Sequence, residues 1–287
     1  MNEPLVFRNY TRTELDRQYN NRAAVPEFLD LYAAWREPGA ALLDAHPHRL
    51  DVAYGPGERT KLDIIMPDPA LSGPGPYPVN VYFHGGYWSS RSKSDLTLTA
   101  RPFVEAGAVA VIAGYTLMPE VNLNELIGQC RAAVAWVHAN AAEINVDPER
   151  LFVSGNSAGG HITAMLMATK DLADKIKGGC ALSGLFDLEP LRHCYMHDDL
   201  KLSPDDVIQN SPVGFDTITS APFIIAVGGD ESDEFKRQSS EFVEAWNGRG
   251  GACTPMTIPG CNHFTIVAEF ADPTTELAIA AVRQMAL

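Results

Sequence analysis

Two hydrophobic patterns alternate along the chain. Short continuous apolar runs, typical of strands buried on both faces, recur at Val79–Phe83, Val109–Ala113, Leu151–Val153, Gly179–Leu182 and Phe223–Val227. Longer segments between and after them predict helices at Asp95–Ala106, Leu123–Ala142, Ala158–Lys170, Ser232–Asn247 and Thr274–Met285. This alternation predicts an α/β fold, with a mostly parallel central sheet, helices on both faces and right-handed crossovers.

Two regions do not follow this alternation. Residues 1–47 predict an N-terminal helical segment, and residues from about 187 to 213 interrupt the strand–helix order. We expect both to form a small layer or lid over a pocket. Residues 48–54 and 60–66 alternate in polarity and predict a β-hairpin across the turn GPGE. The Pro/Gly-dense stretch 67–78 has the character of a loop and not of a linker, so residues 1–287 are expected to form a single domain.

Composition excludes several classes of function. Hydrophobic residues make up 46% of the chain and charged residues 20%, which is typical of globular proteins. The formal charge of −14 disfavours binding to nucleic acid and to anionic membranes. No apolar stretch has the length of a signal peptide or a membrane span. The five cysteines are odd in number and form no C-x-x-C pair, so we expect reduced thiols in a cytoplasmic protein. A homodimer is compatible with these features.

The segment GNSAGG places Ser157 between the predicted strand 151–153 and a helix that begins at Ala158. A G-x-S-x-G motif in this strand–turn–helix setting predicts a nucleophile elbow, in which glycines keep side chains out of a sharp turn. The alternative is a glycine-rich turn that merely opens a helix. A phosphate-binding loop is excluded by the absence of G-x-x-x-x-G-K-[ST] and G-x-G-x-x-G patterns. Ser157 is therefore the candidate nucleophile.

A serine nucleophile needs a base and an orienting acid, which follow the serine in the order acid, then histidine. Of the downstream histidines, His161 lies one helical turn after Ser157, whereas His263 follows a strand candidate in the loop PGCNHF. His263 is therefore the candidate base. The acid should follow the strand 223–227, where the sequence reads GGDESDE. Glu231 is the candidate, with Asp230 as the alternative, because spacing does not determine side-chain direction in a loop.

The segment HGGYW follows the strand 79–83 and precedes the predicted elbow in the chain. HGG loops in this order supply backbone N–H groups that stabilise an oxyanion. Gly85 and Gly86, together with Ala158, are the candidate donors, because glycine lets bare backbone approach the substrate. We interpret His84 as a residue that holds the loop. Tyr87 and Trp88 are candidate walls of the substrate pocket, and packing of Trp88 in the core is the alternative.

These motifs together resemble the arylformamidase (kynurenine formamidase) branch of the α/β-hydrolases, close to the hormone-sensitive-lipase-like esterases. The resemblance extends over nearly the whole chain and includes ELDRQY at 14–19, GYTLMP at 114–119, LSGLFDLEP at 182–190, NSP at 210–212, EFKRQS at 234–239 and NHF at 262–264. It implies a serine hydrolase without metal or cofactor, with Ser157, an acid and His263. The family carries Asp where Glu231 stands, and the animal formamidases tend to carry His where Asn156 stands.

The sequence therefore predicts hydrolysis of a carboxylic ester or an aryl formamide or amide through an acyl-enzyme. An arylformamidase that acts on N-formylkynurenine is the narrower alternative, in which Tyr87, Trp88 and Tyr115 would hold the aromatic ring. A metal-dependent hydrolase would use His193 and His197, spaced i, i+4, with Asp198 or Asp199. A non-catalytic binding protein on the same fold is the remaining alternative.

Overall fold

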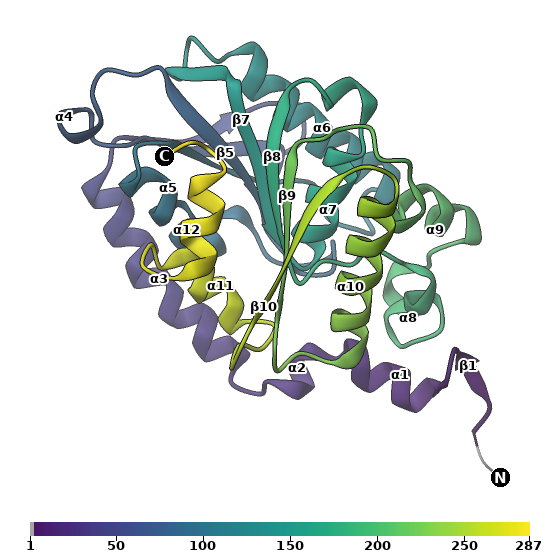
Figure 1. Ribbon diagram of the computed structural model, residues 1–287. Coiled ribbons are helices and arrows are strands. Elements are labelled where there is room, and N and C mark those ends of the chain that lie inside the picture. The colour runs from purple at the N-terminus through teal and green to yellow at the C-terminus, as the bar shows by residue number, and fades with distance from the viewer. Residues whose placement is uncertain (1–2) are drawn as a thin grey trace.

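The computed structural model describes residues 3–287, so residues 1 and 2 of the predicted N-terminal segment lie outside the described residues. A twisted sheet of eight strands forms the centre of this part of the chain, in the order β10-β9-β8-β7-β5-β6-β4-β3 (Figure 1). The strands are β3 His48–Ala53, β4 Lys61–Ile65, β5 Tyr77–Phe83, β6 Val109–Ala113, β7 Val146–Asn156, β8 Ile176–Leu182, β9 Pro222–Gly228 and β10 Ala252–Ile258. β4 pairs antiparallel with both of its neighbours, and the other pairs are parallel. The predicted mostly parallel α/β-hydrolase sheet is confirmed.

Helices cover both faces of the sheet, as Figure 1 shows. One face carries α6 Leu123–Ala139, α7 Ala158–Met167 and α10 Asp233–Gly248. The other carries α3 Phe28–Ala45, α5 Arg101–Glu105, α11 Thr265–Ala271 and α12 Glu276–Arg283. Alternate strand residues belong to the two hydrophobic cores on opposite faces of the sheet. Val81 of β5 packs with the first group of helices and Tyr82 with the second. This alternation explains why the strands read as continuous apolar runs.

Shorter elements complete the described chain. They are the ribbon β1 Leu5–Phe7 and β2 Tyr10–Thr11, the helices α1 Arg12–Tyr19, α2 Asn21–Ala24, α4 Pro69–Ser72, α8 Met196–Leu200 and α9 Pro204–Asn210, and 3₁₀ turns at Lys93–Ala100, Lys170–Leu172, Glu189–Arg192 and Pro212–Gly214. Apart from the ribbon, residues 3–47 contain α1, α2 and α3. The single-domain organisation stays a prediction. No helix within residues 3–287 is both long and apolar enough to cross a bilayer.

One predicted element differs from the structure. The helix expected over 95–106 is a 3₁₀ turn followed by α5, because the backbone leaves helical geometry at Leu96 and Pro102 favours a new helix start. The strand before His263, predicted without bounds, is β10, which contains Pro255. β10 is an edge strand, and an edge tolerates proline because one side of its backbone needs no ladder hydrogen bonds.

The predicted motifs lie together at one end of the sheet, where the parallel strands terminate. β5 and β7 are neighbours with Phe83 opposite Gly155, so the HGG loop and the elbow leave the sheet side by side. β9 and β10 are neighbours with Gly228 opposite Ile258, which brings together the loops that carry Glu231 and His263. The strand order reverses between β5 and β7, and open parallel sheets bind ligands in the crevice at such a reversal.

Candidate active site

Ser157 occupies the sharp turn between β7 and α7 and is 4% exposed. Its backbone has φ 55° and ψ −118°, a conformation that costs a non-glycine residue on the order of 1–3 kcal/mol. The turn is closely packed, because a Cβ on Gly159 would overlap the carbonyl oxygen of Phe83 and one on Gly155 would lie 2.6 Å from that oxygen. The two motif glycines are therefore required by the contact between the elbow and β5.

Glu231 and His263 meet beside this turn. The Oε2 atom of Glu231 lies 2.6 Å from Nδ1 of His263, and both side chains are buried. The second oxygen, Oε1, accepts hydrogen bonds from the backbone N–H of Gly228 at 2.7 Å and from the Ser183 hydroxyl at 2.5 Å. Each carboxylate oxygen thus has a partner, which holds the Glu231 side chain in one orientation toward the imidazole.

Asp230, the alternative acid, is exposed at the surface. Its backbone N–H donates to the carbonyl oxygen of Cys261 at 3.0 Å, which ties the two loops together. Its carboxylate forms no hydrogen bond or ion pair with His263. The structure therefore brings the Glu231 carboxylate to the histidine and leaves that of Asp230 in solvent.

Ser183 is a buried residue of this site that the sequence prediction does not include. It follows β8 directly, has φ 50°, and its backbone N–H donates to the carbonyl oxygen of Ala226 at 2.7 Å. Its hydroxyl therefore reaches the Glu231 carboxylate from the neighbouring strand. The signal that could have identified it is its position at the carboxyl end of a central parallel strand.

Ser157 and His263 line one small cavity, of about 30 Å³. The remaining wall consists of Asn21, Arg22, Tyr32, Gly86, Tyr87, Arg91, Asn156 and Phe264. The first three belong to α2 and α3, so the N-terminal segment covers the site. Within residues 3–287 no hydrogen bond joins the Ser157 hydroxyl to His263; such bonds often tighten only when substrate binds.

The predicted lid, 187–213, contributes no side chain to the wall of this cavity within the described residues. It reaches the site indirectly. The carbonyl oxygen of Asn210 lies 2.8 Å from Nε2 of His161, whose Nδ1 lies 3.2 Å from the indole N–H of Trp88. This chain of contacts connects α9, α7 and the HGG loop.

The oxyanion donors differ from the prediction at one position. The backbone N–H of Gly85 donates to Oδ1 of Asn156 at 3.0 Å, and the same oxygen accepts the hydroxyl of Tyr82 at 2.9 Å. Gly85 is therefore occupied and cannot serve as a free donor. The N–H groups of Gly86 and Ala158 make no hydrogen bond within residues 3–287. These two groups remain the candidate oxyanion donors.

Of the three predicted wall residues, only Tyr87 lines the cavity. Trp88 is fully buried, with its ring edge-on to His161 at 5.0 Å. Tyr115 is also fully buried, and its hydroxyl donates to the carbonyl oxygen of His84 at 2.7 Å. A side chain without exposed surface cannot contact a substrate in this conformation, so we correct the roles of Trp88 and Tyr115 to support of the HGG loop.

His84 and His161 are the two fully buried histidines of the site region. Burial lowers the pKa of each to about 4, so both are neutral at pH 7. His84 stacks on Tyr115 with ring centroids 4.3 Å apart, and its Nδ1 lies 2.7 Å from the carbonyl oxygen of Gly85. These contacts fit the predicted role of His84 in holding the loop.

The alternative metal site is not assembled. Nε2 of His193 lies 2.8 Å from Oε1 of Glu189, whereas Nδ1 of His197 has no hydrogen-bond partner among the described residues. Within residues 3–287, no group of three or more His, Cys, Asp and Glu side chains is arranged to hold a metal ion. The i, i+4 spacing of the two histidines therefore does not produce a shared set of ligands.

Comparison with known proteins identifies the family. A model of the α/β-hydrolase fold matches residues 80–209. A kynurenine formamidase from Danio rerio is 33% identical over 232 residues, covering 78% of this chain and 77% of the relative. This chain belongs to the kynurenine formamidase-like α/β-hydrolases. It is accordingly a hydrolase, and its relatives support an ester or a formamide as the substrate.

Solved structures agree with this assignment to the α/β-hydrolases. A protein from Silicibacter sp. TM1040, described as a candidate thioesterase, is 30% identical and superposes with a TM-score of 0.81, covering 94% of this chain and 99% of that one. An esterase from the archaeon Pyrobaculum calidifontis has a TM-score of 0.72 at 19% identity, with 96% and 95% covered, and shows the fold alone.

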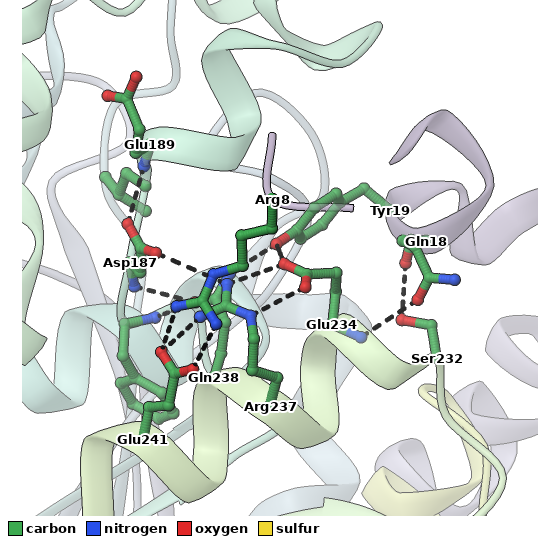
Figure 2. A network of polar contacts seen from close by, with 12 residues as sticks. Arg8, Gln18, Tyr19, Asp187, Glu189, Ser232, Glu234, Arg237, Gln238 and Glu241 are labelled. Atoms are coloured by element: carbon green, nitrogen blue, oxygen red, sulfur yellow. Dashed lines mark hydrogen bonds and ion pairs between the residues drawn. The ribbon is translucent and has the colours of Figure 1, made fainter. Parts of the chain in front are cut away.

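The N-terminal layer of this hydrolase is anchored on α10 by a buried polar network (Figure 2). The hydroxyl of Tyr19 donates to Glu234 at 2.8 Å and accepts from the amide of Gln238 at 2.8 Å. Arg237 donates to both oxygens of Glu234, each at 2.8 Å. Burial and the Glu234 carboxylate raise the pKa of Tyr19 well above its usual value, so its hydroxyl stays protonated.

The same network fixes the position of α2 over the cavity. The backbone carbonyl of Gln18 accepts the hydroxyl of Ser232, and that of Tyr19 accepts the hydroxyl of Tyr87 at 2.7 Å. Asp16 accepts the backbone N–H of Tyr195 at 2.6 Å. The segment ELDRQY therefore joins α1 to α10, to the HGG loop and to the region before α8, and α2 follows it directly.

Proposed function

We propose that this hydrolase cleaves a carboxylic ester or an aryl formamide through an acyl-enzyme on Ser157. The observation that carries the proposal is the convergence of three elements at one cavity. The strained serine, the Glu231–His263 pair and the N–H groups of Gly86 and Ala158, which have no hydrogen-bond partner within residues 3–287, come from the loops after different strands. They meet at the end of the sheet where these strands terminate.

In the first step, the Ser157 oxygen attacks the substrate carbonyl carbon while Nε2 of His263 takes the serine proton. The carbonyl oxygen becomes an anion that the N–H groups of Gly86 and Ala158 stabilise, each contributing about 2.7–4 kcal/mol to lowering the barrier. Glu231 holds His263 with Nδ1 protonated and stabilises the imidazolium. Collapse of the tetrahedral intermediate breaks the carbonyl–heteroatom bond, and His263 donates its proton to the leaving alcohol or amine.

In the second step, water attacks the acyl-Ser157 ester and gives a proton to His263. The second tetrahedral intermediate expels the Ser157 oxygen, which recovers that proton, and releases a carboxylic acid. The alcohol or aryl amine and the acid are the two products. Both steps use the same donors and the same base, so no further group is required.

The narrower candidate is an arylformamidase that acts on N-formylkynurenine. The small volume of the cavity, about 30 Å³, favours a small acyl group over a long one. A formyl group is the smallest acyl group available. Kynurenine formamidases from Danio rerio and Salmo salar, at 33% and 31% identity, support the same choice.

The test compares Ser157→Ala with the wild-type protein on p-nitrophenyl acetate and on N-formylkynurenine. We expect turnover of both to fall at least about 10³-fold in the variant, because no other group attacks the carbonyl carbon. Retained turnover would contradict the serine mechanism. A wild-type protein that hydrolyses neither these compounds nor other short esters and aryl amides would favour the non-catalytic binding protein.

A further inference from the structure

The carboxyl end of β8 contacts two of the three candidate catalytic residues. The carbonyl oxygen of Leu182, the last residue of β8, accepts the backbone N–H of Ser157 at 2.7 Å. The next residue in the chain is Ser183, whose hydroxyl donates to Oε1 of Glu231 at 2.5 Å. Two consecutive residues therefore hold the backbone of the candidate nucleophile and the side chain of the candidate acid.

Ser183 is itself held firmly beside the sheet. Its backbone N–H donates to the carbonyl oxygen of Ala226 in β9 at 2.7 Å, and the residue is 1% exposed. Its φ of 50° lies in the left-handed region, which a glycine adopts without strain and a serine does not. The hydroxyl makes one hydrogen bond among residues 3–287, and that bond goes to Glu231. A serine here is therefore strained, and the one polar contact that its side chain gains is with the candidate acid.

The Ser183 hydroxyl completes the contacts that fix the plane of the Glu231 carboxylate. Rotation about the last bond of a glutamate side chain is soft, because this sp³–sp² torsion has broad minima. Oε1 accepts from Ser183 after β8 and from the N–H of Gly228 at the end of β9, at 2.5 and 2.7 Å. Two donors from different strands oppose this rotation, so Oε2 stays 2.6 Å from Nδ1 of His263. With the backbone donor alone, the carboxylate can turn away from the imidazole.

We propose that Ser183 is a positioning residue for the reaction at Ser157. By holding Oε1 of Glu231, its hydroxyl directs Oε2 to Nδ1 of His263 and keeps the imidazole in the orientation that takes the serine proton. This inference rests on the proposed function and deepens it. Ser183 is absent from the cavity wall, so it acts through the carboxylate and makes no contact with the substrate. Because Leu182 holds the backbone of Ser157, the same turn also fixes the nucleophile relative to the acid.

The kinetic test compares Ser183→Ala and Ser183→Gly with the wild-type protein on p-nitrophenyl acetate. Both changes remove the hydroxyl, and only Ser183→Gly also relieves the backbone at φ 50°. We expect kcat to fall by about 10- to 100-fold in each variant while KM changes less than about twofold, because the imidazole acts in the proton transfers and not in substrate binding. A wild-type kcat in both variants, or a loss expressed only in KM, would overturn the inference.

A stability measurement separates positioning from support of the fold. Ser183→Gly should be at least as stable as Ser183→Ala in urea, because glycine adopts φ 50° without strain, yet its kcat should be just as low. Ser154→Ala is the control, because Ser154 is buried in β7 and its hydroxyl accepts a hydrogen bond from the amide of Asn80 at 2.7 Å. That variant should lose stability and keep kcat within about twofold of wild type. An equal loss of kcat in Ser154→Ala would count against Ser183 as a positioning residue, since any buried serine of the sheet would then have the same effect.

A spectroscopic measurement separates this inference from the proposed function. A ring proton shared in a short, charge-assisted hydrogen bond is strongly deshielded, so the Nδ1–H of His263 should resonate far downfield of the backbone amides. Proton NMR is recorded on the Ser157→Ala protein, with and without Ser183→Ala, and Glu231→Gln identifies the resonance by removing it. We expect Ser183→Ala to shift the resonance upfield or to broaden it beyond detection.

This NMR comparison needs no substrate. If no formamide or ester is hydrolysed, the proposed function fails while the comparison still decides whether Ser183 holds the Glu231–His263 pair. An unchanged resonance in the Ser183→Ala protein would overturn the inference. A resonance missing from the Ser157→Ala protein itself would also overturn it, because the hydrogen bond that Ser183 is proposed to position would then not exist.

Discussion

Nδ1 of His263 lies 2.6 Å from Oε2 of Glu231, and the two residues are 32 positions apart in the chain. Their contact depends on β9 and β10 being adjacent parallel strands, so that the loops after both strands leave the same edge. The Glu231 carboxylate is held on its other side by Ser183 and Gly228. An imidazole oriented in this way has its remaining nitrogen available for the reacting serine.

We therefore expect Glu231→Gln to lower kcat/KM by about 10³- to 10⁴-fold, because an amide can favour the wrong tautomer of the histidine and cannot stabilise the imidazolium. Asp230→Asn is the matched control and should remain within about twofold of wild type, because Asp230 is exposed. Steady-state kinetics on one ester measures both. A comparable loss in the two variants would contradict the assignment of Glu231.

Asn156 should control the geometry of the oxyanion loop. Its Oδ1 accepts the N–H of Gly85 and the hydroxyl of Tyr82, so Asn156→Ala leaves both donors unpaired. We expect kcat to fall by about 10- to 100-fold with a small change in KM, because misplacement of Gly86 weakens transition-state binding.

Tyr82→Phe is the control for Asn156, since it removes the other donor to the same oxygen and leaves the loop contact in place. Its kcat should remain close to wild type while its free energy of unfolding falls by about 1 kcal/mol. An equal loss of kcat in the two variants would mean that the loop is not positioned through Asn156.

The backbone of Ser157 should make the elbow a site where glycine is tolerated unusually well. At φ 55° a Cβ is strained, so Ser157→Gly should be as stable as Ser157→Ala or more stable, by roughly 1 kcal/mol. At an ordinary helical position the Ala variant is more stable than the Gly variant. Ser240 on α10 is exposed, and there the Gly variant should be less stable than the Ala variant by about 1 kcal/mol. Urea unfolding measures the stability of all four variants. The same order of stability for Gly and Ala at both sites would contradict backbone strain at Ser157.

The network in Figure 2 should couple the N-terminal layer to substrate binding. Tyr19→Phe removes the donor to Glu234 and the acceptor of Gln238, and we expect it to lower the free energy of unfolding by about 1–3 kcal/mol. It should also raise KM, because α2 carries Asn21 and Arg22.

The control for Tyr19 is Tyr77→Phe, which removes a hydrogen bond to the carbonyl oxygen of Gly73 at the opposite end of β5. That variant should lose stability without any change in KM. If Tyr19→Phe and Tyr77→Phe affect KM alike, the layer is not held by this network.

Stability should fall as the pH is lowered from about 6.5 to 4. Burial lowers the pKa of His84 and His161 to about 4, so the unfolded chain binds more protons than the folded one in this window. Well above pH 6.5 both histidines are neutral in the folded and in the unfolded state, and the effect vanishes. Each histidine contributes a slope of about 1.4 kcal/mol per pH unit within the window. Urea unfolding from pH 7 to 4.5 should show a smaller slope for His161→Gln than for the wild type.

The central strands and the turns that carry the candidate site residues could be predicted from the sequence because they depend on local pattern and chain order. The apolar runs identify the central strands, and the motifs after two of them identify the HGG loop and Ser157. The prediction failed where contacts between distant segments decide the outcome. Tyr115 was predicted as a wall residue, and Trp88 as either a wall residue or a core residue, yet both are fully buried, in contact with His84 and His161 respectively.

The sequence by itself determined the α/β class, the sharp strand-to-helix turn at Ser157 and the approximate position of His263, the candidate base, since short-range periodicity and turn chemistry carry that information. Only the tertiary structure decided that Glu231 reaches His263, that Gly85 is occupied by Asn156, and that Asn21, Arg22 and Arg91 face the nucleophile. The physical reason is that side-chain direction in a loop follows from the register of neighbouring strands. That register is set by packing across the whole sheet.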